Sequence, residues 1–242
     1  MKLVVAPDYE TLTELAADFI AETVADKPDA VLALPTGSTP LGAYRRLILK
    51  ARHGHLDLSR VTTFNLDEYV GVGLRDPLSY HAYMTEHLFS QVNVDPARIH
   101  LPDGLAPDPE AEGRRYEAEI TRAGGIDLAV LGIGANGHIG FNEPGGPFES
   151  RTRPVRLSAE TIVAMQAEAP SEGRLPVTAL TLGIATIMEA RQVLLLAAGP
   201  EKAEAVARAL QGPVDVAVPA SVLQRHPRAT FLVDREAASR LK

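Results

Sequence analysis

The feature that most constrains the fold is a regular alternation between two kinds of segment along the chain. Short apolar runs, typical of buried strands, occupy residues 3–6, 30–34, 61–65, 126–133, 192–198 and 229–233. Between them lie segments with helical patterns, at residues 12–24, 41–52, 80–89, 110–122 and 201–210. Strands that alternate with helices form parallel sheets with right-handed crossovers. The pattern therefore predicts an α/β fold, with an open, mostly parallel, Rossmann-like sheet and helices on both faces.

The composition predicts one globular domain over residues 1–242, because no linker, repeat or low-complexity stretch interrupts it. The net charge of −7 argues against nucleic acid as a partner, since phosphate backbones bind basic faces. The chain has no cysteine, which excludes disulfides and cysteine-bound zinc and suits a reducing cytoplasm. No apolar run approaches the roughly 18 residues of a membrane span, and the N-terminal apolar stretch is too short for a signal peptide. We therefore expect a cytoplasmic protein with no membrane partner.

The least patterned stretch is residues 158–176, which contain two prolines and a glycine. Such a segment is typical of a flap or lid over an active site. An inert surface excursion would have the same pattern, so both interpretations stay open.

Polar, glycine-rich segments follow four of the expected strands. They are residues 35–40 (PTGSTP), 66–71 (LDEYVG), 134–145 (GANGHIGFNEPG) and 199–202 (GPEK). Ligands of an open parallel sheet bind outside the carboxyl ends of its strands. We therefore expect these four segments to meet at one rim, where they would supply backbone N–H donors, carboxylates, a histidine and a lysine.

Two of these segments favour an anion. Residues 35–40 form a turn that leads into a helix N-terminus, where unpaired N–H groups and the helix dipole attract phosphate. The segment lacks the G-K-[ST] pattern of a nucleotide P-loop, so ATP is not implied. Lys202 lies in a first helical turn, where its charge opposes the helix dipole unless an anion binds nearby. An ordinary strand–turn–helix connection and a solvated surface lysine remain the alternatives.

The other two segments carry groups suited to proton transfer. Asp67 and Glu68 are adjacent, so in a strand only one of them would face the cleft. His138 lies among glycines and five residues before Glu143, which suggests proton transfer near neutral pH. Solvated loop acids and a structural histidine are the alternatives for these positions.

No sequence pattern indicates a metal or a serine nucleophile. His53 and His55 form an isolated H-x-H pair, and the H-E-x-x-H and G-x-S-x-G patterns are absent. We therefore expect no metal site.

The motifs PTGSTPLGAY, FNLDEYVG, GIGANGHIGFNEPG followed by SRTR, and GPEKAEA closely resemble those of the glucosamine-6-phosphate deaminases, in the same order over nearly the whole chain. The related 6-phosphogluconolactonases share the fold and a G-H element, but lack this FNEP and DEYVG. The resemblance implies conversion of glucosamine 6-phosphate and water to fructose 6-phosphate and ammonia in amino-sugar catabolism. The reaction would pass through ring opening and an enolamine, without metal, nicotinamide or pyridoxal phosphate.

The resemblance also implies roles for particular residues. Asp67 matches the base that moves the C2 proton, His138 the group that assists ring opening, and Glu143 the carboxylate that supports the histidine. The family's phosphate-binding positions correspond to Gly37, Ser38, Thr39 and Lys202.

Three departures from the family pattern affect these expectations. Many members have aspartate where this chain has Asn136, which can orient an imidazole through a hydrogen bond but adds no charge. The flap arginine of relatives falls near Gln166, where no arginine is adjacent, and Arg174 is a possible substitute. The chain ends soon after Val233, whereas allosteric hexameric relatives extend further, and Arg153 alone matches one of their effector positions. We therefore expect a non-allosteric monomer.

Two other functions fit parts of the sequence. A sugar-phosphate lactonase would hydrolyse a ring ester and release no ammonia. A sugar-phosphate sensor would resemble the effector domains of some repressors, which carry a DNA-binding domain in front. Here the first expected strand begins at Leu3, which leaves no room for such a domain.

Overall fold

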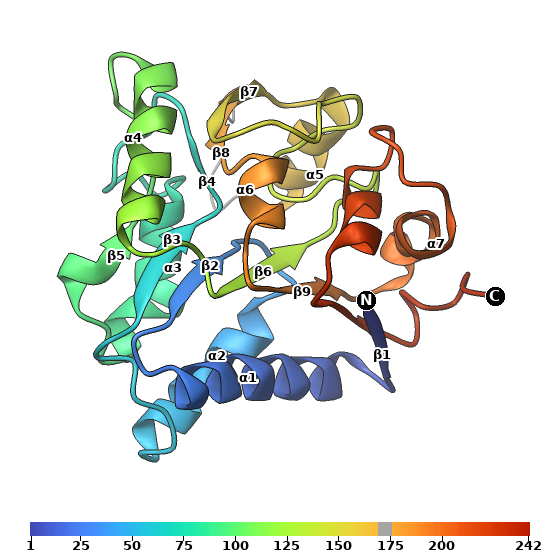
Figure 1. Ribbon diagram of the computed structural model, residues 1–242, viewed down its shortest axis with the longest axis horizontal. Helices are drawn as coiled ribbons and strands as arrows, with labels where there is room; N and C mark the ends of the chain where they lie inside the picture. Colours follow the sequence, from blue (N-terminus) through green and yellow to red (C-terminus); the bar gives the residue numbers. More distant parts are fainter. Residues whose placement is uncertain (169–175) are drawn as a thin grey trace.

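The computed structural model describes residues 1–168 and 176–242 and has a seven-stranded sheet at its centre (Figure 1). The strand order is β1-β10-β9-β6-β2-β3-β5, and every neighbouring pair is parallel. The strands are β1 (Lys2–Ala6), β2 (Val31–Leu34), β3 (Thr62–Asn65), β5 (Ile99–His100), β6 (Leu128–Gly132), β9 (Gln192–Ala197) and β10 (Ala229–Asp234). The predicted α/β class and parallel sheet are thus confirmed.

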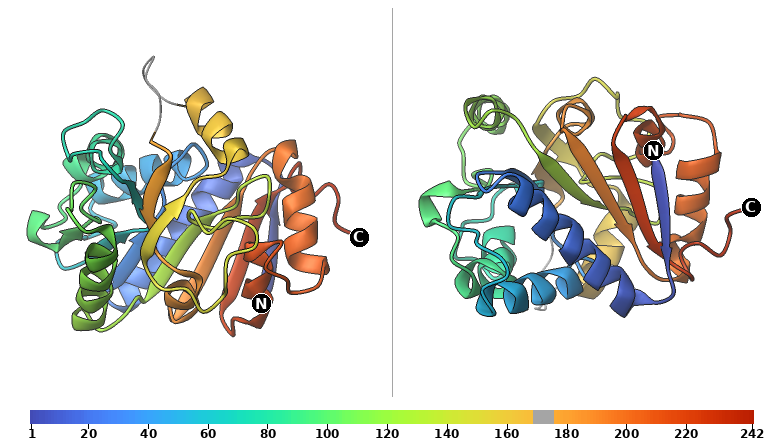
Figure 2. Two further views of the ribbon diagram at one scale, coloured as in Figure 1. Left: turned by 90° about the horizontal axis from the view of Figure 1, so that it is seen from above. Right: turned by 60° about the horizontal axis from the view of Figure 1, so that its bottom comes forward.

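Helices cover both faces of this sheet. They are α1 (Tyr9–Asp26), α2 (Leu41–Arg52), α3 (Tyr80–His87), α4 (Pro109–Arg122), α5 (Ala159–Glu168), α6 (Ile184–Met188) and α7 (Ala203–Gln211), with short 3-10 turns at Phe89–Gln91, Pro96–Arg98, Pro200–Lys202 and Pro219–Arg225. Helices α1, α2 and α3 share one apolar cluster with alternate sheet residues, and α4, α6 and α7 share the other. Figure 2 shows α1 and α2 lying across one face. Burial on both faces explains why the central strands are almost wholly apolar.

A second, three-stranded antiparallel sheet stands beside the main one. It consists of β4 (Asp67–Tyr69), β8 (Thr178–Thr181) and β7 (Arg153–Arg156), with β8 in the middle. The sequence did not predict this sheet, because its strands are three or four residues long and carry many polar residues. Its position matters for function, since β4 begins with Asp67.

Helix α5 lies in the stretch that showed no clear pattern. Ser158 caps it by accepting a hydrogen bond from the Thr161 N–H at 3.1 Å. Ile162 and Met165 pack on a small apolar cluster, whereas Val163 is 72% exposed. Because apolar residues occur on both sides of this helix, its hydrophobic pattern is weak.

None of the helices in residues 1–168 and 176–242 is both long enough and apolar enough to cross a membrane.

Candidate functional site

The four predicted segments meet around one cavity of about 380 Å³, at the carboxyl ends of β2, β3, β6 and β9. All but one of the candidate residues line it: Gly37, Ser38, Thr39, Asp67, Asn136, His138 and Lys202. Glu143 does not line the cavity, but its carboxylate contacts His138 and Asn136. Arg174 falls outside the described residues.

The loop of residues 35–40 forms one wall and leads into the N-terminus of α2. Gly37 has a φ of +97°, a conformation that side-chain-bearing residues rarely adopt, so the turn needs glycine there. Lys202 ends the 3-10 turn that follows β9 and lines the same cavity. The loop and one lysine thus line a single space next to a helix N-terminus, an arrangement suited to a phosphate.

Asp67 and Glu68 have different environments despite being adjacent, because side chains alternate along β4. Asp67 lines the cavity and is only 6% exposed. In the described part of the chain no hydrogen bond reaches its carboxylate. Burial, with a smaller contribution from the Glu68 carboxylate, raises the pKa of Asp67 to about 8. A carboxyl group with this pKa is a strong general base once it is ionised.

Glu68 points away from the cavity and has a structural role. Its carboxylate accepts hydrogen bonds from the Ser79 hydroxyl at 2.6 Å and from the backbone N–H groups of Tyr69, Tyr80 and His81 at 2.8, 3.2 and 3.3 Å. It therefore caps the N-terminus of α3 and joins that helix to β4. Of the two adjacent acids, only Asp67 is placed to meet a ligand.

His138 stands on a tight loop that closely surrounds its ring. The Gly134 N–H donates to the His138 carbonyl at 3.0 Å, and a Cβ at Gly134 would lie 2.3 Å from Cε1 of the ring. Glycine at position 134 is therefore required by the imidazole itself. Nδ1 of His138 lies 3.7 Å from Oε2 of Glu143. The Glu143 carboxylate therefore faces the Nδ1 side of the ring.

Glu143 is the centre of a polar network behind His138. Asn136 donates its amide to Oε2 at 2.9 Å and accepts the His138 backbone N–H at 3.1 Å. Burial opposes ionisation of Glu143, but His138, together with hydrogen bonds from Thr161 and Asn136, lowers its pKa to about 2. Glu143 is therefore an anion throughout the working pH range. Asn136 thus contacts the backbone of His138 and the side-chain carboxylate of Glu143, but not the imidazole ring itself.

Helix α5 contributes residues that the sequence analysis missed. The Thr161 hydroxyl and the Ser158 N–H both donate to Oε1 of Glu143, the latter at 3.2 Å. Met165 lines the cavity beside Tyr80, and its sulfur accepts a hydrogen bond from the Tyr69 hydroxyl at 3.3 Å. The one sequence signal for these residues is Ser158, which could have predicted the start of a helix. Nothing in the pattern indicates that this helix packs against Glu143.

No group of three or more potential metal ligands is found among residues 1–168 and 176–242.

A family model for glucosamine-6-phosphate isomerases and 6-phosphogluconolactonases matches residues 8–232. The chain belongs to this family. A glucosamine-6-phosphate deaminase of Rhodopirellula baltica is 51% identical over 241 residues, which span 100% of this chain and 96% of the relative. Glucosamine-6-phosphate deaminase 2 of Bacillus subtilis is 51% identical over 247 residues, covering 100% of this chain and 98% of the relative.

Solved structures of family members agree with this placement. A protein described as a monomeric glucosamine-6-phosphate deaminase superposes with a TM-score of 0.96 at 47% identity, over 99% of both chains. The 6-phosphogluconolactonase of Trypanosoma brucei has a TM-score of 0.76 at 23% identity, covering 100% of this chain and 98% of that one. The second likeness shows a shared fold only.

Proposed function

We propose that this chain is a glucosamine-6-phosphate deaminase, which converts glucosamine 6-phosphate and water to fructose 6-phosphate and ammonia. The observation that carries the proposal is that a buried carboxyl group, an imidazole and an anion-binding loop line one cavity. The reaction needs these three parts together, because the phosphate must hold C1 and C2 of the sugar against two proton-transfer groups. The deaminase relatives, at 51% identity over full length, support the same conclusion.

The phosphate of the substrate would bind to the loop at Gly37, Ser38 and Thr39 and to the Lys202 ammonium group. The net charge of −7 repels an anionic substrate at long range, so a local positive site is needed. Binding energy from this remote group orients the reacting carbons.

His138 would open the pyranose ring, because the closed sugar has no acidic C2 proton. The imidazole accepts the proton of the C1 hydroxyl and a proton is delivered to the ring oxygen as the C1–O5 bond breaks. The product is an aldehyde at C1. The ionised Glu143 stabilises the imidazolium that forms in between.

Asp67 would then remove the C2 proton, which the C1 aldehyde makes acidic. The electron pair of the C2–H bond forms the C1=C2 double bond of an enolamine, while a proton from the 2-ammonium group passes to O1. Reprotonation at C1 gives an iminium ion at C2, and water attacks C2 to displace ammonia. The 2-ammonium group of the bound substrate favours the ionised form of Asp67 in advance of this step.

The direct test is incubation of the protein with glucosamine 6-phosphate and measurement of both products. We expect ammonia and fructose 6-phosphate in equal amounts. Hydrolysis of 6-phosphogluconolactone without ammonia release would instead identify a lactonase. Tight binding of the sugar phosphate without turnover would identify a sensor.

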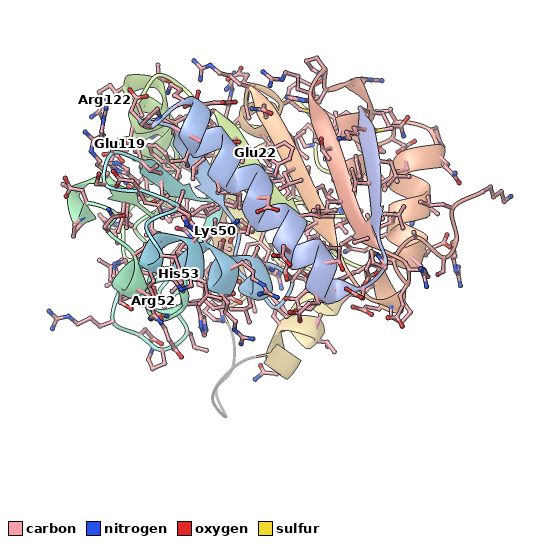
Figure 3. All side chains as sticks on the ribbon, turned by 90° about the horizontal axis from the view of Figure 1, so that it is seen from below. Glu22, Lys50, Arg52, His53, Glu119 and Arg122 are labelled. Carbon is pink, nitrogen blue, oxygen red and sulfur yellow. The ribbon has the colours of Figure 1, made fainter. Side chains whose placement is uncertain are left out.

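Replacement of Lys202 with alanine is expected to raise the KM for glucosamine 6-phosphate by about 10–100-fold and to change kcat much less. The reason is that a charge-assisted contact to a phosphate contributes about 1.5–3 kcal/mol, and the phosphate is not altered in the reaction. Lys50 is the matched control, because it lies near the C-terminal end of α2 (Figure 3) and pairs with Asp18 at 2.6 Å. Equal KM values for the Lys202→Ala and Lys50→Ala variants would contradict the phosphate site.

The proposal includes a cytoplasmic, non-allosteric monomer in amino-sugar catabolism. The structural relative described as monomeric supports the assembly state. Residues 158–168 would act as part of the predicted lid, since Glu160, Thr161, Ala164 and Met165 line the cavity from α5; residues 169–175 of the predicted lid lie outside the described residues.

A further inference from the structure

Three tyrosine hydroxyls bind the backbone carbonyls of the loop at residues 35–39. Tyr44 donates to the Pro35 carbonyl at 2.5 Å and Tyr83 to the Gly37 carbonyl at 2.6 Å. Tyr9 donates to the carbonyls of Ser38 and Thr39 at 3.3 and 3.1 Å. We propose that Tyr9, Tyr44 and Tyr83 are positioning residues that fix the loop in its phosphate-binding conformation. This inference rests on the proposed function, because it assumes that the loop binds the substrate phosphate.

The direction of the N–H groups follows from the geometry of the peptide bond. In a planar trans peptide the carbonyl of one residue and the N–H of the next point in opposite directions, and the described chain contains no cis peptide bond. Holding the Gly37 carbonyl therefore also fixes the Ser38 N–H, and holding the Ser38 carbonyl fixes the Thr39 N–H.

The tyrosines stand behind the loop as seen from the cavity. All residues from 35 to 40 line the cavity, whereas the three tyrosines do not. Carbonyls that point back to the tyrosines leave the following N–H groups on the cavity side. The tyrosines thus orient the donors that a phosphate needs without contacting the phosphate themselves.

The three tyrosines belong to three different helices, so the conformation of the loop is set by the packing of these helices on the main sheet. Tyr9 begins α1, Tyr44 belongs to α2 and Tyr83 to α3. Burial raises the pKa of Tyr44 well above its usual value, so its hydroxyl remains a donor at all working pH values. The Tyr9 hydroxyl also accepts the Gly42 N–H at 3.1 Å, which ties the start of α2 to the same point.

Preorganisation of this kind acts on affinity. A loop without these anchors must lose conformational freedom when the phosphate binds, and that entropy cost weakens binding. Because the phosphate is bound equally in the ground state and the transition state, the effect falls on KM rather than on kcat.

The test uses the variant Tyr83→Phe, which removes one hydroxyl and keeps the ring packed on His87 at a centroid distance of 4.6 Å. We expect the KM for glucosamine 6-phosphate and the inhibition constant of inorganic phosphate to rise together, about three- to tenfold. The kcat should stay within about twofold of the wild-type value, and the pH profile of kcat should keep its position. Tyr9→Phe is a second variant for which folding is not at risk, because Tyr9 is 39% exposed, and it should raise both constants about twofold.

Tyr116→Phe is the matched control for loss of a buried tyrosine hydroxyl. Its hydroxyl donates to the carbonyls of Asn65 and His100, at 2.9 and 3.1 Å, outside the phosphate loop. This variant should lose stability and leave the phosphate inhibition constant unchanged. If Lys202→Ala weakens phosphate binding but Tyr83→Phe and Tyr9→Phe do not, the positioning role is wrong and the phosphate site stands. If none of the three variants affects phosphate binding, the site and the inference both fail.

Discussion

Replacement of Asp67 with asparagine is expected to lower kcat by a factor on the order of 10²–10⁴ and to make the folded protein more stable. The loss of activity follows because an amide cannot accept the C2 proton. The gain in stability follows because the buried carboxylate has no hydrogen-bond partner in the described part of the chain, and an ionised group in such a place is costly. We expect a gain of about 2–6 kcal/mol above pH 8, since each unit of raised pKa corresponds to about 1.4 kcal/mol, and we expect to measure it as a rise in Tm.

The pH dependence of this gain has a definite sign. The pKa of Asp67 is about 8 in the folded protein, above the ordinary aspartate value of 3.8. Between these values the folded protein holds a proton on Asp67 that the unfolded chain has released, so wild-type stability falls as the pH rises. The difference in Tm between Asp67→Asn and the wild type should therefore grow from pH 4 to pH 8 and level off above. A difference that shrinks over this range would refute the raised pKa.

Glu68→Gln is the natural comparison, because the two acids are adjacent. Glu68 is fully buried and accepts four hydrogen bonds from donors that a glutamine side chain cannot all satisfy. This variant should therefore lose about 1.5–3 kcal/mol of stability and keep more than a tenth of the wild-type kcat. The two neighbouring substitutions would then have opposite effects. Asp67→Asn would lose activity and gain stability, whereas Glu68→Gln would keep activity and lose stability.

The main sheet could be predicted from the sequence because buried parallel strands are almost purely apolar. Residues 126–133 and 192–198, for example, were expected as strands and form β6 and β9 with small differences at their ends. The rule that ligands bind at the carboxyl ends of parallel strands predicts that Lys202 and His138 lie close together, although they follow different strands. Both residues line the same cavity.

The parts of the site that could not be predicted depend on contacts between distant and weakly patterned segments. The strand that carries Asp67 is three residues long and pairs with β8, more than 100 residues away in the chain. Thr161 binds Glu143 from a helix whose apolar residues do not form one stripe. Tyr83 is an ordinary helix residue by pattern, and only the fold places its hydroxyl on Gly37.

Replacement of His138 with glutamine is expected to lower kcat by a factor on the order of 10²–10⁴, because ring opening loses its proton carrier. The KM should change little, since the phosphate contacts remain. His226→Gln is the control: His226 is 2% exposed, and its Nε2 lies 2.8 Å from the Ala190 carbonyl, away from the cavity. That variant should lose stability and keep its kcat. Similar losses of kcat in both variants would contradict a chemical role for His138.

A double-mutant cycle then decides whether Glu143 acts through the imidazole. Glu143→Gln alone should lower kcat about 10–100-fold, the effect typical of a partner that orients and supports a functional histidine. Glu117→Gln is its matched control, because Glu117 also accepts threonine hydroxyl bonds, at 2.6 Å from Thr152 and 2.5 Å from Thr186, but has Arg151 rather than His138 as its charged neighbour. In the His138→Gln background, the Glu143 substitution should cost almost nothing, since there is no imidazolium left to stabilise. A further loss of tenfold or more in the double variant would mean that Glu143 acts on the substrate directly.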